Sequence, residues 1–378
     1  MNVIMNKPEL WSDSRILNIG SGFRHKMLCT GPTFTAGSAC VYDCAYCYVE
    51  DMVGAKPFVT NVLQGRCFQS VVIRRRDAVG KLRQELRSRG RLKFKASTGV
   101  IFGSPLVDIA PTLALTQETI EIVKVLLSDT GWEVRLLSKS PLIVKIAEAL
   151  TAEEKKRVIF GLSTGTFDDA TARAIEPSCP SPSRRVDALR WLQDHGFRTY
   201  GMLCPILPQA AGEHRAYAEL AFSKVRPDRC EHVWAEVLNE RSGSTQKTVA
   251  ALELAGLNAA AVALAAVSGK ANGAAWEQYA RDTFLALAAA MPRNAAGPKL
   301  RFLQYESRAT ERWWRKQIPD GAVLLSKVQT QPEATGNPIK GNCNNQAEMF
   351  IAAPPKDPKR VAAAHKAWDT IRARVAGK

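Results

Sequence analysis

Short apolar runs alternate with helix-like stretches through the middle of the chain, a pattern typical of repeated strand–helix units around a parallel sheet. The runs predicted to be strands are 99–102, 133–137, 158–162, 198–203 and 233–238. The stretches predicted to be helices are 117–128, 141–149, 185–195 and 213–223. Pro141 suits a first helical turn, and Gly196 suits the position just after a helix. The pattern therefore predicts an α/β fold.

The pattern changes towards the C-terminus. Residues 242–290 are rich in alanine and predicted to be helical, and their most apolar part, 250–267, is predicted to be a packed helix. Residues 329–346 resemble a loop or linker, and residues 356–375 a final basic helix. We therefore expect an N-terminal extension (1–32), a core domain (33–240), a helix-rich part (241–328), and a linker with a basic C-terminal helix (329–378).

Length and cysteine content place the chain in a broad class. A chain of 378 residues is long enough for one large domain with a well-buried core. No run of about 18 apolar residues is present, so no membrane partner is expected. The N-terminus lacks a cationic start followed by an apolar segment. The nine cysteines, an odd number, favour a reducing compartment. We expect the protein in the cytoplasm, or in the host cytoplasm if it is viral.

The net charge of +16 is concentrated in a few places. Residues 74–95 hold ten lysines and arginines against Asp77 and Glu85, and 356–378 hold seven against two acids. In residues 312–316, tryptophans that could stack on bases stand between cations. A polyanionic partner such as DNA or another nucleic acid would explain all three segments. The alternative is that they are solvated helix faces.

Three cysteines form the most informative motif. Cys40, Cys44 and Cys47 follow the spacing C-x3-C-x2-C, which lets one short loop supply three thiolates to a cubane iron–sulfur cluster. The fourth iron would lack a local cysteine and would be open to a substrate or cofactor. The alternative is a zinc site with Cys29 or Cys67 as the fourth ligand.

This spacing, with Tyr46 before the last cysteine, resembles the signature of the radical S-adenosylmethionine (SAM) superfamily. Further segments are similar to those of the spore photoproduct lyase-like branch and come in the same order. They are 46–50, 102–105, 137–141, 161–164, 176–182 (Glu-Pro-Ser-Cys-Pro-Ser-Pro) with Arg185, and 202–208. The likeness spans roughly residues 33–240.

The resemblance implies a partial (β/α)6 barrel with a [4Fe-4S] cluster on the cysteine loop. It also implies SAM across the carboxyl ends of the strands and a low-potential electron donor. Tyr46, Ser104, Lys139 and Ser163 match positions that contact SAM in the lyase-like branch. The structural alternatives are that Lys139 is an exposed lysine at a strand end and that the serines cap turns or helices. For Glu176 and Arg185, a structural ion pair and a SAM contact are equally open.

One position departs from the lyase pattern. In those lyases a cysteine directly before the matching serine returns a hydrogen atom to the product radical, and here Gly103 stands in that place. Cys204, at another predicted strand end, is the alternative thiol, unless it is a buried core cysteine. Tyr48 and Tyr42 are candidates for lining the substrate space, unless they only pack in the core.

Together these features predict a radical SAM enzyme that abstracts hydrogen from a thymine-type pyrimidine of DNA or from its substituent. The result would be base modification or isomerisation, including thymine hypermodification of the phage type. A repair lyase with an altered hydrogen return is the first alternative. A nucleic-acid-binding protein with a structural metal site is the second. A peptide or small-molecule substrate with an incidental basic surface is the third.

Overall fold

The computed structural model describes residues 7–325 except 55, 89–93, 95, 104, 210–212, 240–242, 270–272, 293–297, 306 and 308. The predicted linker and basic C-terminal helix, 329–378, lie outside the described residues. So does Ser104.

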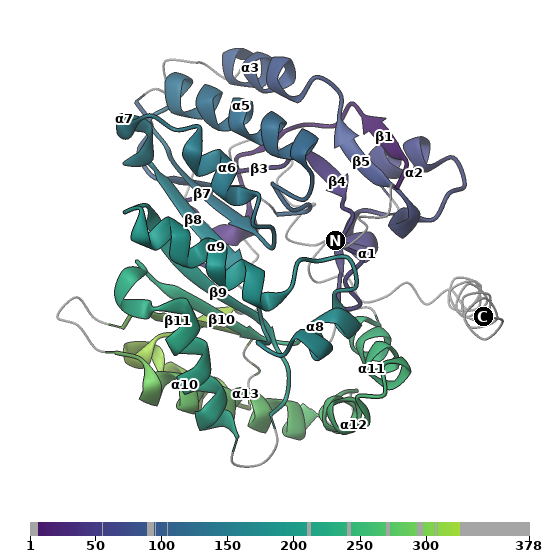
Figure 1. Cartoon of the computed structure of the whole chain (residues 1–378), viewed down its shortest axis with the longest axis vertical. Coiled ribbons are helices and arrows are strands. Elements are labelled where there is room, and N and C mark those ends of the chain that lie inside the picture. The colour runs from purple at the N-terminus through teal and green to yellow at the C-terminus, as the bar shows by residue number, and fades with distance from the viewer. Residues whose placement is uncertain are drawn as a thin grey trace.

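A nine-stranded sheet forms the centre of the molecule, in the order β12-β11-β10-β9-β8-β7-β6-β3-β2 (Figure 1). Its neighbours are parallel except β2 and β3, and β6 to β12 follow one another in chain order. Seven successive parallel strands, β6 to β12, confirm the predicted α/β class. The sheet has one strand more in this run than the predicted partial (β/α)6 barrel, and it is open between β12 and β2. The strands are β2 (Leu17–Asn18), β3 (Thr33–Phe34), β6 (Val100–Gly103), β7 (Glu133–Ser138), β8 (Val158–Ser163), β9 (Arg198–Ile206), β10 (Val233–Val237), β11 (Leu300–Tyr305) and β12 (Ala322–Leu325).

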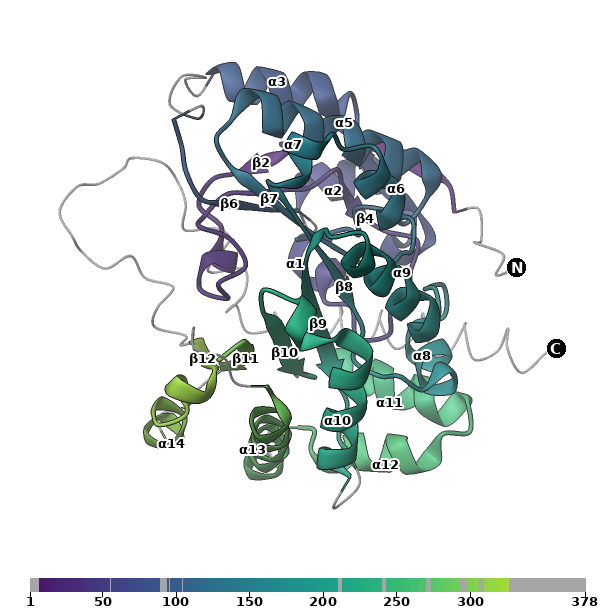
Figure 2. The same cartoon turned by 60° about the vertical axis from the view of Figure 1, so that its left-hand side comes forward.

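Helices cover the outer face of this sheet, where Figures 1 and 2 show them side by side. They are α3 (Ala78–Ser88), α5 (Leu113–Asp129), α6 (Ile143–Glu148), α7 (Ala152–Lys155), α9 (Pro182–Asp194), α10 (His214–Val225), α13 (Gly273–Ala290) and α14 (Glu311–Arg315). The four helices predicted between strands are all present. Two begin earlier than predicted because side chains cap them: Thr112 accepts from the Leu115 amide and Ser181 from the Arg184 amide.

The two faces of the sheet pack against different groups, because neighbouring side chains on a strand point to opposite faces. Val134, Leu136 and Phe160 pack towards the helices in the main core. Ile159, Tyr200 and Trp234 belong to a second cluster on the inner face. The sheet is therefore apolar on both sides, as parallel sheets usually are.

Residues 21–30 cover part of this inner face. Leu28 and Cys29 pack in the second cluster with Trp234. The indole nitrogen of Trp234 donates to the Lys26 carbonyl at 2.8 Å, and Arg135 donates to the Leu28 carbonyl at 2.7 Å. A segment that the sequence places in an N-terminal extension thus packs on the inner face beside β7 and β10.

A three-stranded sheet, β1-β5-β4, carries the cysteine loop. It consists of β1 (Glu9–Ser12), β4 (Gly37–Ala39) and β5 (Val72–Arg75), and the short helices α1 (Val49–Val53) and α2 (Pro57–Leu63) lie beside it (Figure 1). Cys40 directly follows β4, so this sheet fixes where the loop begins.

Arg74 and Arg75, the start of the predicted basic patch, are buried in β5. Arg74 pairs with Glu9 and Glu118, at 2.9 and 3.1 Å, and Arg75 donates to Ser38 at 2.6 Å. The expectation that the whole 74–95 segment faces a polyanion is wrong for these two, because internal partners use their charge. Arg83 and Arg87 are exposed on α3.

The tryptophan pair near the C-terminal end of the described chain was also expected at the surface. Trp314 is fully buried, its indole nitrogen donates to Glu277 at 2.5 Å, and its ring stacks on Phe302. Trp313 is half-buried, and the Arg281 guanidinium lies 4.6 Å from its ring centroid. The expectation of base stacking is wrong for Trp314, because that side chain forms part of the core.

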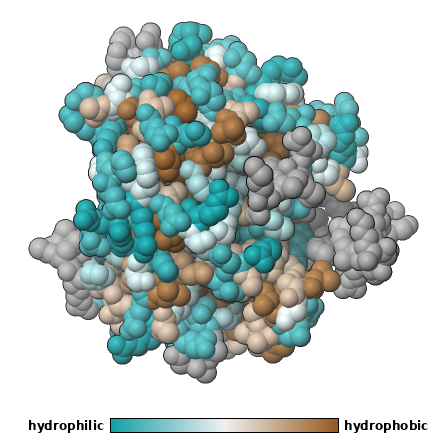
Figure 3. Space-filling model, in the orientation of Figure 1, coloured by the Kyte–Doolittle hydropathy of each residue, from teal (hydrophilic) through white to brown (hydrophobic). Residues whose placement is uncertain are grey.

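The alanine-rich stretch 250–267 falls in two helices, α11 (Ser244–Leu254) and α12 (Asn258–Ala266), which contact each other near α8 (Asp169–Ile175). They bury Leu252 and Leu264 but leave Leu254 and Val262 about two-thirds exposed, at 68% and 69%. Figure 3 shows tan and brown residues over these helices at the lower right. The stretch is thus packed on one side only. Within the described part of the chain, no helix is long and apolar enough to cross a membrane.

We expect Trp314→Ala to lower the free energy of unfolding by about 3–5 kcal/mol, the usual cost of removing a buried aromatic side chain. Arg312→Ala, which changes an exposed neighbour, should leave it nearly unchanged. Urea unfolding of both variants measures the difference. Equal, small losses would mean that Trp314 is a surface residue after all.

Candidate metal centre and active site

Polar side chains end several neighbouring strands on the inner face of the large sheet. Lys139 follows β7, Ser163 ends β8, Cys204 lies in β9, Glu236 lies in β10 and Tyr305 ends β11. By alternation they share a face with Leu137, Tyr200, Met202, Trp234 and Leu303. Ligands of parallel α/β sheets bind beyond the carboxyl ends of the strands, so this row is the candidate active site.

The three motif cysteines lie together beside this row. Cys44 is buried in a cluster with Tyr42 and Cys179, and the half-buried Cys40 and Cys47 pack against this cluster. Burial raises the pKa of Cys40 to about 12 and that of Cys47 to about 11. A hydrogen bond with Cys179 and the charge of Lys139 lower the pKa of Cys44. Three thiols on one loop in an apolar surrounding are a donor set that fits an iron–sulfur cluster.

An ion network joins this loop to the strand ends. The Lys139 ammonium lies 2.8 Å from Glu176 Oε1 and 3.6 Å from Cys44 Sγ, and it also donates to the Tyr46 hydroxyl. Arg185 pairs with the other carboxylate oxygen of Glu176 and donates to the Ser163 carbonyl at 3.1 Å. Burial alone would raise the pKa of Glu176, but Lys139 and Arg185 lower it to about 2. The predicted Glu176–Arg185 pair is present.

Asp108 fixes the start of the loop that carries Lys139. Its half-buried carboxylate accepts from the Ser138 hydroxyl and from the Lys139 amide, both at 2.6 Å. On the neighbouring loop, a side chain on Gly165 would meet the Pro205 carbonyl at 1.5 Å, so only glycine fits there. Neither residue was predicted. For Asp108, the only signal in the sequence was its place shortly after the predicted strand 99–102.

Cys204 has a charged neighbourhood that the sequence did not reveal. Its sulfur lies 3.9 Å from the Glu236 carboxylate, which pairs with Lys26 at 2.9 Å and accepts from Asn239 at 2.8 Å. Burial, followed by the charge of Glu236, raises the pKa of Cys204 to about 12. The charge of Lys139 lowers this pKa in part, so Lys139 is near enough to Cys204 for their charges to interact. The thiol is half-buried and protonated at neutral pH.

The other predicted residues lie outside the ion network of Lys139, Glu176 and Arg185, or contact it only through the backbone. Ser163 donates to the Cys204 carbonyl at 3.1 Å. Tyr48 is half-buried and immediately precedes α1, and Tyr42 is buried among the cysteines. A side chain on Gly103 would meet Phe34 at 2.6 Å and Leu136 at 3.1 Å. Both belong to the core between sheet and helices. Position 103 therefore points away from the strand-end row.

Neither cysteine considered as a fourth zinc ligand lies with the motif. Cys29 packs on the inner face beneath the row, and Cys67 is exposed. The cysteine that contacts the motif is Cys179, whose sulfur is 3.7 Å from that of Cys44. The zinc alternative stays a prediction, and the structure adds Cys179 as a further thiol beside the motif.

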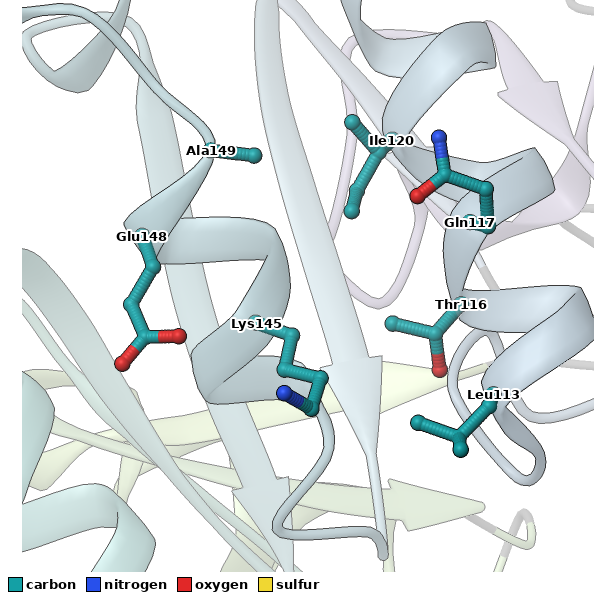
Figure 4. Close-up of a pocket in the computed structure, with 7 residues that line it drawn as sticks. All are labelled: Leu113, Thr116, Gln117, Ile120, Lys145, Glu148 and Ala149. Atoms are coloured by element: carbon teal, nitrogen blue, oxygen red, sulfur yellow. The ribbon is translucent and has the colours of Figure 1, made fainter.

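A separate hollow of about 470 Å³ lies between α5 and α6 on the outer layer (Figure 4). It is lined by Leu113, Thr116, Gln117, Ile120, Lys145, Glu148 and Ala149. It contains none of the predicted site residues, and its lining offers no group of catalytic side chains.

Two curated proteins are similar to this chain, and no family model matches it. ORF301 of Acidianus two-tailed virus, uncharacterized, is 25% identical over 241 residues, which are 62% of this chain and 76% of that protein. MJ0683 of Methanocaldococcus jannaschii, also uncharacterized, is 25% identical over 173 residues, 45% of this chain and 58% of that protein.

Solved structures of spore photoproduct lyase also resemble the fold. A double mutant with bound AdoMet and dinucleoside spore photoproduct has a TM-score of 0.43 and 12% identity, over 59% of this chain and 61% of that one. A complex with dinucleoside spore photoproduct has a TM-score of 0.40 and 15% identity, over 58% and 59%. This chain thus spans about three-fifths of each lyase chain.

We expect Glu176→Gln to lower the free energy of unfolding at pH 7 by about 3–5 kcal/mol, because Arg185 would keep a buried charge without its partner. The folded pKa of Glu176 is below its ordinary 4.5, so its contribution is present above pH 4.5 and is lost as pH falls towards 2. Urea unfolding across this range should show the two proteins converging at low pH. Glu153→Gln, at an exposed pair, is the control. A loss independent of pH would contradict the assignment.

Proposed function

We propose that this protein is a radical SAM enzyme that acts on a pyrimidine base of DNA. One observation supports the proposal: the Lys139 ammonium, at the end of β7, lies 3.6 Å from Cys44 Sγ, and Cys40 and Cys47 pack in the same cluster as Cys44. A structural metal site would need the thiols, but it would not need the half-buried Lys139 ammonium and a row of polar side chains beside them.

Cys40, Cys44 and Cys47 would hold a [4Fe-4S] cluster, and Lys139, Tyr46 and Ser163, with Ser104 by resemblance, would contact SAM. When bound, the cluster and SAM would supply 5′-deoxyadenosyl radical chemistry, by which a hydrogen atom could be abstracted from the substrate. A low-potential one-electron donor is required as a partner.

The Lys139 ammonium is suited to the carboxylate of SAM. It has three donors, and these now serve Glu176, Tyr46 and Cys44. When Lys139 turns to an incoming carboxylate, Arg185 continues to neutralise Glu176. The presence of Arg185 therefore lowers the free-energy cost of moving Lys139 away from Glu176.

Cys204 is suited to return hydrogen to a product radical. Hydrogen-atom transfer requires the S–H form, and burial beside Glu236 keeps this thiol protonated. The transfer leaves a thiyl radical, which one electron and one proton from the donor system would reduce to the thiol. This route favours a second candidate function, a repair lyase in which Cys204 takes the place of the missing thiol at Gly103.

The choice of DNA rests on charge and on the resemblance of the motifs. The net charge is +16, and the described part of the 74–95 segment retains the exposed cations Arg83 and Arg87. Phosphate neutralisation by such side chains supplies affinity without sequence preference. A thymine-type base or its substituent, modified or isomerised as in phage thymine hypermodification, is the substrate we propose.

The first experiment is anaerobic reconstitution with iron and sulfide, followed by dithionite and SAM, with 5′-deoxyadenosine measured by mass spectrometry. We expect product that increases with DNA and disappears in Cys44→Ala. Product without any DNA effect would replace the substrate class with a peptide or small molecule. No product from a loaded cluster would reject the enzyme and favour a structural site.

Lys139→Ala should weaken SAM binding by about 1.5–3 kcal/mol, the scale of a charged hydrogen bond. Equilibrium binding to the reconstituted protein measures this. Lys145→Ala, at the outer hollow, is the matched control and should bind SAM normally. Equal SAM affinity in the two variants would remove Lys139 from the SAM site.

Cys204→Ala should still form 5′-deoxyadenosine but should lose turnover or change the nucleoside product, because only the return of hydrogen is removed. Chromatography of digested DNA with mass detection identifies the product. Cys230→Ala, at a buried thiol elsewhere, is the control. The same product at the same rate from both variants would show that Cys204 is a core thiol.

A further inference from the structure

Two thiols and a carboxylate from distant parts of the chain meet below the cysteine loop. Cys44, Glu176 and Cys179 are all buried, and their ligand atoms lie within 4.8 Å of one another. Cys44 and Cys179 are 135 positions apart in the sequence, and their sulfur atoms are 3.7 Å apart. Cys179 has no assigned role in the proposed reaction.

The separation of the two sulfur atoms matches a single metal ion. At a metal–sulfur distance of about 2.3 Å, two thiolates on one tetrahedral ion are about 3.8 Å apart. Thiolates on different irons of a cubane cluster lie farther apart, because an iron–iron edge stands between them. The geometry of Cys44 and Cys179 therefore fits one shared ion better than two corners of a cluster.

Local structure keeps Cys179 and Glu176 on the same side of their loop. The Cys179 amide donates to the Glu176 carbonyl at 3.0 Å, which closes a tight turn. Arg185 braces this turn by donating to the Pro180 carbonyl at 2.8 Å while it pairs with Glu176. The two side chains are thus held towards Cys44 by contacts that involve no metal.

A cation already lies against this group. The Lys139 ammonium contacts Cys44 Sγ at 3.6 Å and Glu176 Oε1 at 2.8 Å, which are two of the three ligand atoms. Positive charge is therefore stabilised here, and a metal ion would compete with the ammonium for the same atoms.

We propose that Cys44, Cys179 and Glu176 form a site for one thiophilic divalent cation, Zn²⁺ or Fe²⁺, in the cluster-free protein. The ion replaces the thiol protons and displaces Lys139 from Cys44 and Glu176. Cys44 also belongs to the proposed cluster, so ion and cluster exclude each other. This last statement rests on the proposed function, whereas the ion site itself does not.

The test uses Co²⁺ as a spectroscopic probe on the full-length, cluster-free protein, reduced and kept anaerobic. We expect one Co²⁺ per chain, with thiolate-to-cobalt charge-transfer absorption and the strong visible bands of tetrahedral cobalt. Cys179→Ser should weaken binding by more than about 10-fold, since even outer-shell changes cost 10–100-fold. The double variant Cys40→Ser/Cys47→Ser should bind as the unchanged protein does.

Two further variants sharpen the test. Cys230→Ser removes a buried thiol elsewhere and should bind Co²⁺ normally, which controls for general effects of losing a thiol. Lys139→Met should bind Co²⁺ more tightly, because it removes the competing ammonium. Circular dichroism confirms that each variant is folded.

The proposal is overturned if the folded, unchanged protein binds no Co²⁺. It is also overturned if binding survives Cys179→Ser but is lost in the Cys40/Cys47 double variant, because the ion then sits on the loop alone.

SAM cleavage by the reconstituted protein is scored separately. Cobalt binding without cleavage would support the ion site and reject the proposed enzyme, and cleavage without cobalt binding would do the reverse.

Discussion

The buried carboxylate of Glu176 is the interaction on which the site depends. An isolated charge in this surrounding would be costly, and Arg185 and Lys139 together offset that cost for the Glu176 carboxylate. Through these partners it connects the proline-rich loop, the end of β7 and, by way of Tyr46, the cysteine loop. Three segments far apart in the sequence are thereby fixed relative to one another by a single neutralised group.

The sheet and the ion network support each other. Parallel strands place Lys139, Ser163 and Cys204 at one edge, but the cysteine loop belongs to a different, three-stranded sheet. Contacts of Lys139 with Cys44 and Tyr46 link the end of β7 to the cysteine loop, at the place where the chemistry is proposed. The sheets thus position the backbone of the site, and the charged side chains connect its parts.

Much of the scaffold could be predicted, because alternating apolar runs reveal strands and amphipathic stretches reveal helices. The cysteine spacing and the Glu176–Arg185 pair were also visible, because both are local in sequence. The contact of Cys44 with Cys179 and the Glu236–Lys26 pair were not, because topology brings them together over long separations. Trp314 and Arg75 were misassigned for a related reason: composition shows that a side chain is aromatic or charged, but not whether the fold supplies it with a buried partner.

The segment 21–30 has a consequence for how a polymer could reach the strand ends. Leu28 and Cys29 pack on the inner face with Trp234, and the backbone of this segment accepts hydrogen bonds from Trp234 and Arg135. The segment therefore occupies inner-face space that a bound molecule would otherwise share, and the polar row at the carboxyl ends is where the proposed substrate would meet the sheet. A nucleic acid would present a base to that row if it turned the base out of its strand.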